Sequence, residues 1–488
     1  MTQNNHTKTK VLSSFLWKFM ERGGTQGIQF IVQIVLARLL LPEDYGIIAL
    51  VVVFTSIAGV FVQSGLNTAL IQKKDADEID FSSVFYLSLF LACSLYIILF
   101  FTAPFIAAFY KMPQITSVFR VLSITLIFGA FNSIQNAIIS RKLQFKRLFF
   151  SSTGAILISG MVGIFMAYSG FGVWALVAQQ IANRFMVMMI LWFTVKWRPH
   201  LVFSFNRVKS LFSFGWKLLM SGLLNTVYND LYSLIIGRIY EPAMLGFYNR
   251  GQQFPKVIVS NFDGTIQSVM LPVLSSQQDN RIKVKNMMRR GIITSSFVIF
   301  PAMIGLIVTA EPVVKLLLTD KWLPSVPFLQ IYCVIYMLMP IHTSNLQAIN
   351  ALGRSDIFLK LEIIKKVLGL IILIITVQYG VYAIAFGGIL SGILSSFINA
   401  YPNKQLLNYS YKEQWNDIMP SLVLSVIMGI VVYSIKLLSM PITILLFVQM
   451  FTGVVTYVGM AKLFKLKCFN YLLNTLSDTF LKRKKEAI

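Results

Sequence analysis

Two stretches of the chain, residues 35–46 (VLARLLLPEDYG) and residues 235–246 (IIGRIYEPAMLG), carry the same motif 200 residues apart. In both copies an arginine is followed four residues later by a proline, and that proline four residues later by a glycine. A Trp-Lys pair precedes each copy, at residues 17–18 and 216–217. Internal duplication of a multi-helix membrane unit is typical of transporters that bind their substrate between two halves. The repeat therefore predicts a carrier with two lobes.

The composition predicts that the chain is embedded in a membrane. Apolar residues make up 56% of the 488 residues and charged residues only 13%, whereas a soluble domain carries about 25% charged residues. Mean hydropathy is +0.71, and apolar runs long enough to span a bilayer recur along the whole chain. The first of them, from about residue 11 to 41, is too long for the apolar core of a cleavable signal peptide. We expect it to form the first spanning helix.

The residues that usually carry catalysis or bind metals are sparse. Three cysteines and three histidines are dispersed along the chain, and their spacing fits neither a disulfide framework nor a metal site. No nucleotide-binding or nucleophile motif is present in the sequence. We expect a protein that is not an enzyme, with no catalytic residue and no cofactor other than a proton or sodium ion that drives transport.

The apolar runs predict an all-α integral membrane protein with about fourteen transmembrane helices. Short loops join the segments, and several of these loops contain proline or glycine. The expected segments are 14–41, 46–71, 82–109, 116–140, 148–169, 172–195, 211–239, 246–272, 290–312, 325–350, 358–379, 381–402, 417–437 and 441–464.

The positive charges predict the orientation of these helices. The two termini and the loops that alternate with the segments onto the same side hold 27 of the 43 Lys and Arg residues, and the opposite loops hold 3. Because cytoplasmic loops are enriched in Lys and Arg, both termini are expected in the cytoplasm. The net charge of +24 is thus a topology signal, and nucleic acid is not expected as a partner.

The repeat extends beyond its first motif. Residues 172–175 (GVWA) match residues 380–383 (GVYA), and residues 133–135 resemble residues 345–347. The unit is therefore six helices, and the two copies insert with the same orientation. We expect two parallel six-helix lobes related by a pseudo-two-fold axis along the membrane normal. The lobes are residues 1–210 and 211–402, and residues 403–488 add two helices and a basic cytoplasmic tail.

Polar residues recur along one face of three apolar segments. In the first segment they are spaced by three or four residues and fall within roughly 80° of one helix face, and the seventh segment repeats the pattern. Tight helix packing favours small residues, whereas these side chains are long, so we expect a water-filled cavity between the lobes. Helix packing stays an alternative for any single residue. The expected substrate-binding residues are Lys18, Arg22, Gln26, Gln29, Gln33, Lys217, Asn225, Tyr228, Arg250 and Gln253.

Three acidic residues in the same segments are candidates for ion coupling, namely Glu21, Asp230 and Asp263. Glu21 can instead pair with Lys18, and Asp230 can serve gating or helix packing. Asp263 is the strongest candidate, because it is a lone acid within an apolar segment. Arg250 either lines the cavity or extends to the membrane interface.

The charges of the stripes indicate the class of substrate. Basic residues outnumber acidic ones, so the cavity favours an anion. The forked guanidinium of Arg suits phosphate oxygens, while Gln, Asn and Tyr suit hydroxyl-rich ligands. A ligand that combines phosphate and sugar fits both features.

Four motifs carry a family resemblance. They are residues 35–46, quoted above, 65–73 (GLNTALIQK), 246–250 (GFYNR) and 320–322 (DKW). With them, residues 10–465 resemble the bacterial oligosaccharide flippases of the multidrug/oligosaccharidyl-lipid/polysaccharide superfamily. Within that superfamily the chain is most similar to the colanic-acid exporter type of lipopolysaccharide biosynthesis flippase.

The resemblance implies the activity and its partners. Such proteins lie in the bacterial cytoplasmic (inner) membrane. They carry a polyprenyl-pyrophosphate-linked oligosaccharide to its outer leaflet by alternating access, for the synthesis of surface polysaccharide and lipopolysaccharide. Basic residues facing the cavity are thought to meet the pyrophosphate, and Arg22, Lys217 and Arg250 match that role. The implied partners are the lipid-linked oligosaccharide, membrane lipids and other membrane proteins of polysaccharide assembly.

Two rival functions follow from the same kind of sequence. A drug or cation exporter of the same superfamily would be expected to carry buried acids, whereas this chain carries more bases. A membrane polymerase or ligase would be expected to carry a long external loop, whereas the longest external stretch here is about 311–324.

Overall fold

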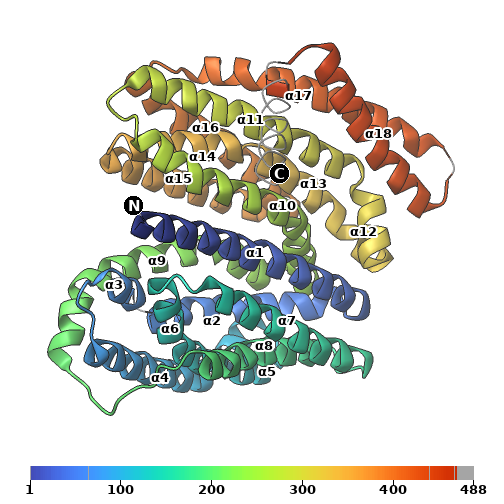
Figure 1. Ribbon diagram of the computed structural model, residues 1–488. Coiled ribbons are helices and arrows are strands. Elements are labelled where there is room, and N and C mark those ends of the chain that lie inside the picture. Colours follow the sequence, from blue (N-terminus) through green and yellow to red (C-terminus); the bar gives the residue numbers. More distant parts are fainter. Residues whose placement is uncertain (1, 64, 439, 467, 470–488) are drawn as a thin grey trace. The chain divides into compact units, whose positions relative to one another are not determined.

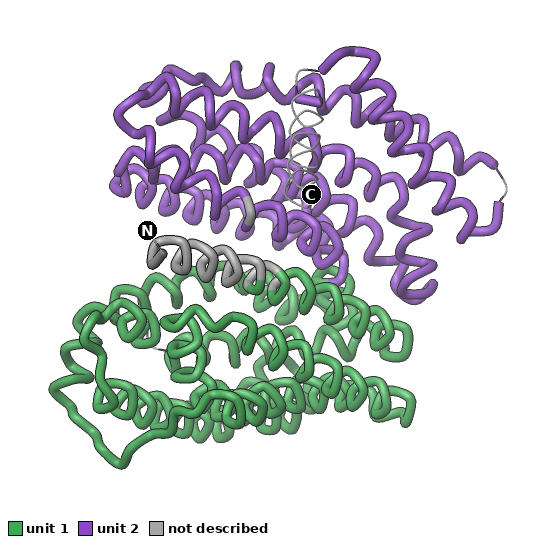
Figure 2. The backbone as a smooth tube through the Cα atoms, in the orientation of Figure 1, with its two compact units in different colours: residues 1–249 green, residues 250–488 purple. Residues whose placement is uncertain are grey.

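The computed structural model describes residues 2–63, 65–438, 440–466 and 468–469, except that the side chains of residues 2–16, 18, 19, 22 and 265 lie outside the description. Within that part, the chain forms helices and turns and no β-strand, as Figure 1 shows. The chain divides into two compact units, residues 1–249 and residues 250–488 (Figure 2). The all-α membrane fold expected from the sequence is therefore confirmed.

Two groups of helices pack together in unit 1. Helix α7 lies against α8 and α1, and α9 lies against α2, α3 and α4. Its buried core includes Leu70, Phe85, Ile134 and Leu191. The helices are α1 (Thr2–Leu39), α2 (Pro42–Gln63), α3 (Leu66–Gln72), α4 (Glu78–Tyr110), α5 (Gln114–Leu122), α6 (Thr125–Arg141), α7 (Phe145–Tyr168), α8 (Val173–Thr194), α9 (Phe205–Ile239) and the first turns of α10 (Pro242–Ser275).

Unit 2 contains the rest of α10 and the remaining helices. Helix α17 packs along α11, and α18 packs on α17. The elements are α11 (Arg281–Val308), α12 (Ala310–Leu318), the 3₁₀ turn η1 (Asp320–Ser325), α13 (Val326–Met337), α14 (Met339–Ala351), α15 (Ser355–Thr376), η2 (Val377–Tyr379), α16 (Val381–Leu407), α17 (Tyr411–Ser434), η3 (Ile435–Leu437) and α18 (Ile442–Leu463).

Each expected segment overlies one helix or two consecutive helices. Eleven helices in the described residues are long and apolar enough to cross a membrane. The segments at 14–41, 211–239 and 358–379 are not among them, and the last carries four charged residues. The number of fourteen spans therefore stays a prediction, as do the lobes 1–210 and 211–402, which rest on the repeat rather than on compactness.

Four of the expected segments contain a break between two α-helices. Segment nine, 290–312, breaks at Thr309 between α11 and α12. Segment two breaks at Gly65, whose φ is 65°, and segment four breaks at residues 123–124 between α5 and α6. Segment ten breaks at Leu338 between α13 and α14. Pro340 lies in the first turn of α14 and marks the break at Leu338, whereas the break at residues 123–124 has neither proline nor glycine beside it.

The duplicated motifs adopt the same local structure. Helix α1 ends at Leu39 and α2 begins at Pro42, and likewise α9 ends at Ile239 and α10 begins at Pro242. Proline suits the start of a helix, because its φ is helical and its missing N–H would have no helical partner there. The second repeated motif also begins a helix in both copies, since a glycine with positive φ precedes α8 and α16.

The basic loops of unit 1 meet at one end of that unit. The Arg141 guanidinium donates to the carbonyl oxygen of Leu70 at 2.9 Å, and Arg207 pairs with Asp77 at 3.2 Å. Lys73 pairs at 2.6 Å with the buried carboxylate of Asp80. The loops 73–81, 141–147 and 196–210, which the charge count assigns to one side, therefore lie together.

The loops of unit 2 segregate in the same way. Lys285 pairs with Glu413 at 3.4 Å, and Arg289 pairs with Asp417, which brings the starts of α11 and α17 together. The other end of α17 is marked by an ion pair of 2.6 Å between Lys436 and Glu311. Within each unit, loops expected on the same side of the membrane lie at the same end.

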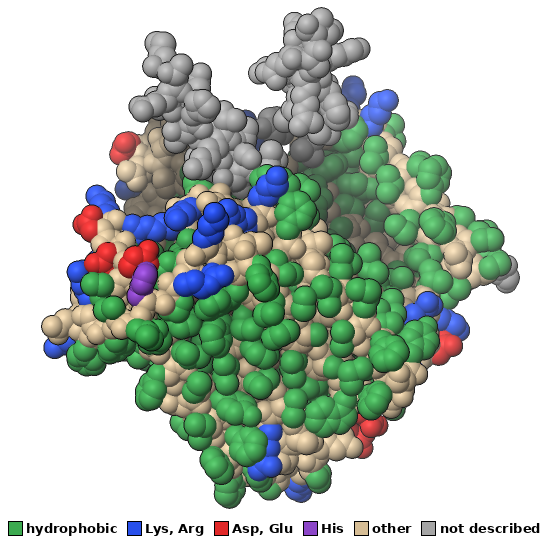
Figure 3. Space-filling view, turned by 60° about the horizontal axis from the view of Figure 1, so that its bottom comes forward, with side chains coloured by type: hydrophobic (Ala, Val, Ile, Leu, Met, Phe, Trp, Pro, Cys, Tyr) green, Lys and Arg blue, Asp and Glu red, His purple; other side chains and the backbone are tan. Residues whose placement is uncertain are grey.

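The surface between these ends is apolar. On α4, Phe90, Phe101 and Phe105 are 68%, 68% and 76% exposed. Figure 3 shows one face covered largely by hydrophobic side chains, with many of its Lys and Arg side chains gathered toward one edge. Exposed aromatic side chains on this scale are expected where lipid replaces water.

Candidate transport site

The polar stripe of α1 presents amide side chains. Gln26, Gln29 and Gln33 are all half-buried, on a helix that packs against α7. The Gln26 Oε1 atom is buried and accepts no hydrogen bond. Leaving a buried acceptor unpaired costs about 1–3 kcal/mol, so Gln26 offers an acceptor to a hydroxyl group. The side chains of Lys18 and Arg22 lie outside the described residues, and Glu21 is half-buried.

The matching stripe of α9 is more open. Lys217 and Asn225 are exposed, whereas Tyr228 and Asp230 are half-buried. An exposed ammonium group on an apolar helix requires water or an anion, because hydrocarbon cannot solvate it. The stripe thus places one cation and several hydrogen-bonding groups along a single helix.

Arg250 of α10 is buried rather than open. It is 4% exposed, and its guanidinium lies over the ring of Trp322 with 5.2 Å between the Cζ atom and the ring centroid. The guanidinium also donates to Gln253 Oε1. The structure therefore brings two of the expected substrate-binding residues together inside unit 2, with Trp322 as a partner. Trp322 belongs to a motif that supports the family resemblance, but the sequence gave no sign of this contact.

Asp263 of α10 is half-buried and bonded across to α14. One carboxylate oxygen accepts a hydrogen bond from Thr343 Oγ1, and the other accepts one from Gln267 Nε2 at 2.7 Å. Gln267 lies one turn further along the same polar face as Asp263. Thr343 was not expected from the sequence, because its role depends on which face of α14 packs toward α10.

Other charged groups of unit 2 pair locally. Glu362 and Lys365 form an ion pair of 2.5 Å on α15, so the partner of Glu362 lies at i+3 on the helix. His342 Nδ1 and Asn399 Nδ2 lie 3.0 Å apart between α14 and α16. In the described part of the chain, no group of three or more His, Cys, Asp or Glu side chains could hold a metal ion.

A cluster of buried amides links α14, α16 and α17. Asn345, Asn403 and Gln414 are each 0% exposed. Asn345 Nδ2 donates to Gln414 Oε1 at 2.8 Å, and Asn403 Nδ2 donates to Asn345 Oδ1 at 2.8 Å. This cluster attaches the C-terminal hairpin, α17 and α18, to the core of unit 2.

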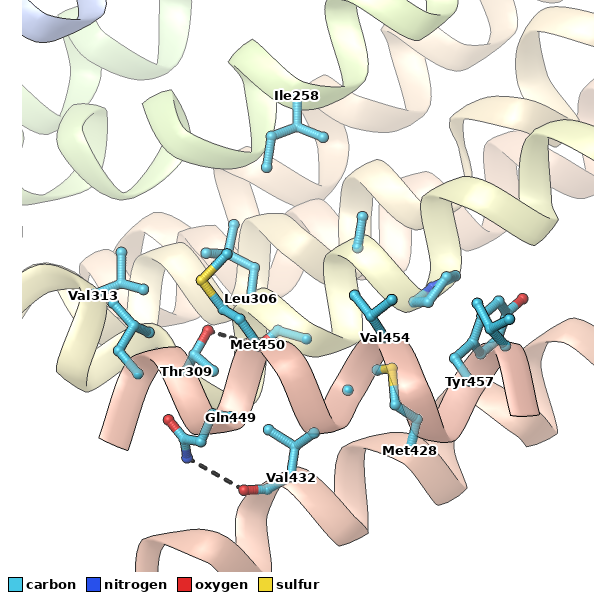
Figure 4. Close-up of a pocket in the computed structure, with 16 residues that line it drawn as sticks. Ile258, Leu306, Thr309, Val313, Met428, Val432, Gln449, Met450, Val454 and Tyr457 are labelled. Carbon is cyan, nitrogen blue, oxygen red and sulfur yellow. Dashed lines mark hydrogen bonds between the residues drawn. The ribbon is translucent and has the colours of Figure 1, made fainter. Parts of the chain in front are cut away.

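An apolar cavity of about 430 Å³ opens between α10–α12 and the C-terminal hairpin. Figure 4 shows Leu306, Met428 and Met450 among the side chains that line it. Two of its polar groups are engaged elsewhere, since Gln449 Nε2 donates to the carbonyl oxygen of Val432 at 3.2 Å and Tyr457 Oη to that of Phe297 at 2.8 Å. The buried Gln449 Oε1 atom accepts no hydrogen bond from the described residues. The cavity can therefore accept a hydrocarbon chain but offers little to a polar ligand.

The fold matches solved structures of membrane transporters. It resembles the lipid II flippase MurJ in an inward closed conformation, with a TM-score of 0.72, 14% identity, and coverage of 92% of this chain and 98% of the other. It also resembles an inward-facing multidrug resistance transporter of the MATE family, with a TM-score of 0.60, 17% identity, and coverage of 78% and 96%. The chain therefore shares its fold with these two solved structures.

Sequence comparison narrows the class. The chain is 23% identical to the lipopolysaccharide biosynthesis protein WzxC of Escherichia coli (strain K12) over 435 residues, which cover 87% of this chain and 88% of that protein. The polysaccharide biosynthesis protein family matches residues 35–327. The chain belongs to this family.

Proposed function

We propose that this protein is a flippase that moves a polyprenyl-pyrophosphate-linked oligosaccharide across the bacterial cytoplasmic membrane for surface polysaccharide or lipopolysaccharide synthesis. The observation that carries the proposal is the duplicated polar stripe on the long helices α1 and α9 of a chain from the polysaccharide biosynthesis family. An enzyme would require catalytic groups, whereas this chain has the fold of transporters.

The proposed path uses the polar stripes for the head of the substrate. Arg22, Lys217 and Arg250 meet the pyrophosphate, and the amides of α1 meet the sugar hydroxyls. The lobes 1–210 and 211–402 rock to open the cavity to either leaflet in turn. Because Arg250 is packed on Trp322 in this conformation, its contact with phosphate requires a second conformation.

The proposed place for the lipid is the membrane itself and the apolar cavity beside the C-terminal hairpin. A polyprenyl chain needs only apolar contact, which Leu306, Met428 and Met450 supply. The lipid tail would stay in the bilayer while the glycan crosses, so the protein has to solvate only the polar head.

The proposed orientation places both termini in the cytoplasm. The segregation of basic loops to one end of each unit supports this assignment, since cytoplasmic loops are rich in Lys and Arg. A proton or sodium ion is the proposed source of energy, and other membrane proteins of polysaccharide assembly are the proposed partners.

A drug or cation exporter is the alternative function, and the fold alone does not exclude it. The charges of the stripes argue against it. The bases Lys18, Arg22, Lys217, Arg250 and Lys256 outnumber the acids Glu21, Asp230 and Asp263. A cationic cavity repels a cationic drug by the same Coulomb term that attracts a phosphate.

The test compares basic residues inside and outside the stripes. Arg22→Ala and Lys217→Ala are expected to reduce polymer output strongly in a strain that needs this protein, at unchanged protein level. Lys412→Ala removes an exposed lysine of α17 outside the stripes and is expected to have no effect. Normal output from the Arg22→Ala, Lys217→Ala double variant would exclude the proposed phosphate contact.

A further inference from the structure

The Asp263 carboxylate has hydrogen-bond donors but no counter-charge. It lies within α10, which is long and apolar enough to cross a membrane, and its two donors, Thr343 and Gln267, are both neutral. In the described residues, no Lys, Arg or His side chain forms an ion pair with it. An ionised carboxylate in such a position costs several kcal/mol, and the described residues supply no charge that offsets this cost.

Lys365, His342 and Lys256 are basic residues of α15, α14 and α10, and none of them pairs with Asp263. Lys365 is paired with Glu362 at 2.5 Å. His342, the neighbour of Thr343, lies with its Nδ1 atom 3.0 Å from Asn399 Nδ2 of α16. Lys256, two turns before Asp263 on the same face of α10, is exposed. Among the described residues, none of these groups neutralises Asp263, so a mobile cation fits the site.

We propose that Asp263, Thr343 and Gln267 form a binding site for a monovalent cation, either Na⁺ or a proton. Carboxylate, hydroxyl and amide oxygens are the ligands that hard cations prefer. Rotation of the Thr343 hydroxyl and of the Gln267 amide turns an oxygen of each toward the ion. This proposal rests on the proposed transport function, since it identifies where the driving ion binds within unit 2.

The test measures ion binding without transport, so it is independent of the substrate. Thermal unfolding of the purified protein is followed in NaCl and in choline chloride, each from pH 5.5 to 8. A bound cation stabilises the folded state, and a rise in Tm of at least about 3 °C is expected. Stabilisation by NaCl identifies Na⁺, whereas stabilisation by low pH in both salts identifies a proton.

The variants locate the site. Asp263→Asn and Thr343→Val are expected to abolish the cation-dependent rise in Tm, while Thr343→Ser retains it. Asp279→Asn, which changes an exposed acid in the loop after α10, is the matched control and retains the full rise. If the wild type shows no dependence on cation or pH, or if Asp263→Asn keeps it, the proposal is wrong.

A second observation concerns the duplicated motif itself. A Cβ atom added to Gly46 would collide with the carbonyl oxygen of Pro242, and one added to Gly246 would collide with that of Pro42. The two motifs therefore touch each other reciprocally, backbone against backbone. Gly237, also from the second motif, likewise leaves room for the side chain of Leu50. All these residues belong to unit 1.

The contact lies at the end of unit 1 away from its basic loops. The basic loop 196–210 contacts α4 at Ser204, whose backbone N–H donates to Ser83 Oγ. Helix α9 begins at the next residue and runs for 35 residues, to Ile239, shortly before α10 begins. The first turns of α2 and α10 therefore cross at the opposite end. Small residues permit such an approach of helix backbones, and any side chain at either glycine separates the helices.

We infer that this reciprocal glycine contact closes the outer end of the transport path and breaks each time that end opens. The inference rests on the proposed alternating access. Gly46→Ala and Gly246→Ala then destabilise only the closed state, so they shift the population toward the open one.

The experiment reads the opening directly. Leu50, which is 1% exposed, is replaced by Cys in a protein whose three natural cysteines are replaced by Ala. Its rate of reaction with a membrane-impermeant maleimide, applied from outside, is expected to rise by about tenfold in Gly46→Ala and in Gly246→Ala. Gly59→Ala is the matched control on α2, because no atom lies within 4 Å of the added Cβ.

The outcomes distinguish this inference from the proposed function. Labelling does not depend on the substrate, so a protein that carries a different cargo still shows the change. Equal labelling rates in the wild type and in both variants, at equal Tm, would overturn the inference. A rise in Gly59→Ala as large as in Gly46→Ala would also overturn it.

Discussion

The Asn345 side chain in α14 donates a hydrogen bond of 2.8 Å to the Gln414 side chain in α17, and Gln414 returns one of 3.1 Å to Asn345. Both residues are fully buried. The pair joins a helix of the predicted second lobe to the C-terminal hairpin, which the sequence presented as an unpaired addition. The hairpin is therefore part of the core of unit 2.

Replacement of Asn345 by Leu is expected to lower the Tm of the protein clearly. It removes the side-chain partner of the buried Gln414 and Asn403 amides, at about 1–3 kcal/mol for each group, and leaves them only the longer bonds to the backbone carbonyl oxygens of Tyr409 and residue 345. Thermal unfolding in detergent measures the loss. The Asn345→Leu, Gln414→Leu double variant is expected to lose less stability than the two single variants lose in sum, because it removes both partners of the hydrogen bonds. Strict additivity would contradict the pairing.

The cap of α4 is expected to weaken in acid. The Asp77 side chain accepts a hydrogen bond of 2.9 Å from the backbone N–H of Asp80 and pairs with Arg207, and these contacts hold the pKa of Asp77 below its usual 3.8. A lowered pKa means that the contribution to stability is present above the unfolded value and is lost as the pH falls through the folded one. Stability measured from pH 6 to 3 should therefore fall less steeply in Asp77→Asn. An unchanged pH profile in that variant would argue against the role of the cap.

Gly380 is expected to tolerate no side chain. Its φ of 105° and ψ of 169° lie in a region that essentially only glycine adopts, and a side chain there costs about 1–3 kcal/mol. Gly380→Ala should lower the Tm accordingly. Gly459→Ala, in the middle of α18 with no atom within 4 Å of the added Cβ, should leave the Tm unchanged or raise it. A similar Tm for both variants would contradict the conformational argument.

Arg250→Lys is expected to destabilise the protein even though it keeps the charge. A compact ammonium cannot both lie flat on Trp322 and reach Gln253 as the guanidinium does, and a cation–π contact away from water is worth about 2 kcal/mol. Comparing Tm with polymer output per folded molecule separates packing from transport. If output per molecule is unchanged while Tm falls, Arg250 serves the packing of unit 2 and not the substrate.

Much of the fold could be read from local sequence. The breaks between paired helices coincide with Pro42 and Pro242, and the basic loops that the charge count grouped together do meet within each unit. These features depend on residues close in sequence or on charge relative to the membrane. Pro340 marks the interruption at Leu338, whereas the interruption at residues 123–124 has no proline or glycine beside it and depends on packing.

The candidate site was only partly accessible to sequence reasoning. Asp263 and Gln267 are four residues apart, a spacing that puts them on one face of a helix, and Gln267 does donate a hydrogen bond to Asp263. Thr343 and Trp322 could not be found in this way, because each contacts the stripe from another helix or turn of unit 2. The burial of Arg250 likewise depends on how the 3₁₀ turn η1 folds over α10.

The breaks in the helices bear on the order of events in the predicted duplication. Segments four and ten occupy matching places in the two copies and are both broken, between α5 and α6 and between α13 and α14. Segment two is broken at Gly65, whereas its counterpart α10 continues from Pro242 to Ser275. A trait shared by both copies is most simply inherited from the single ancestral unit. On the predicted duplication, the broken fourth helix is older than the duplication, whereas the difference at Gly65 arose after it.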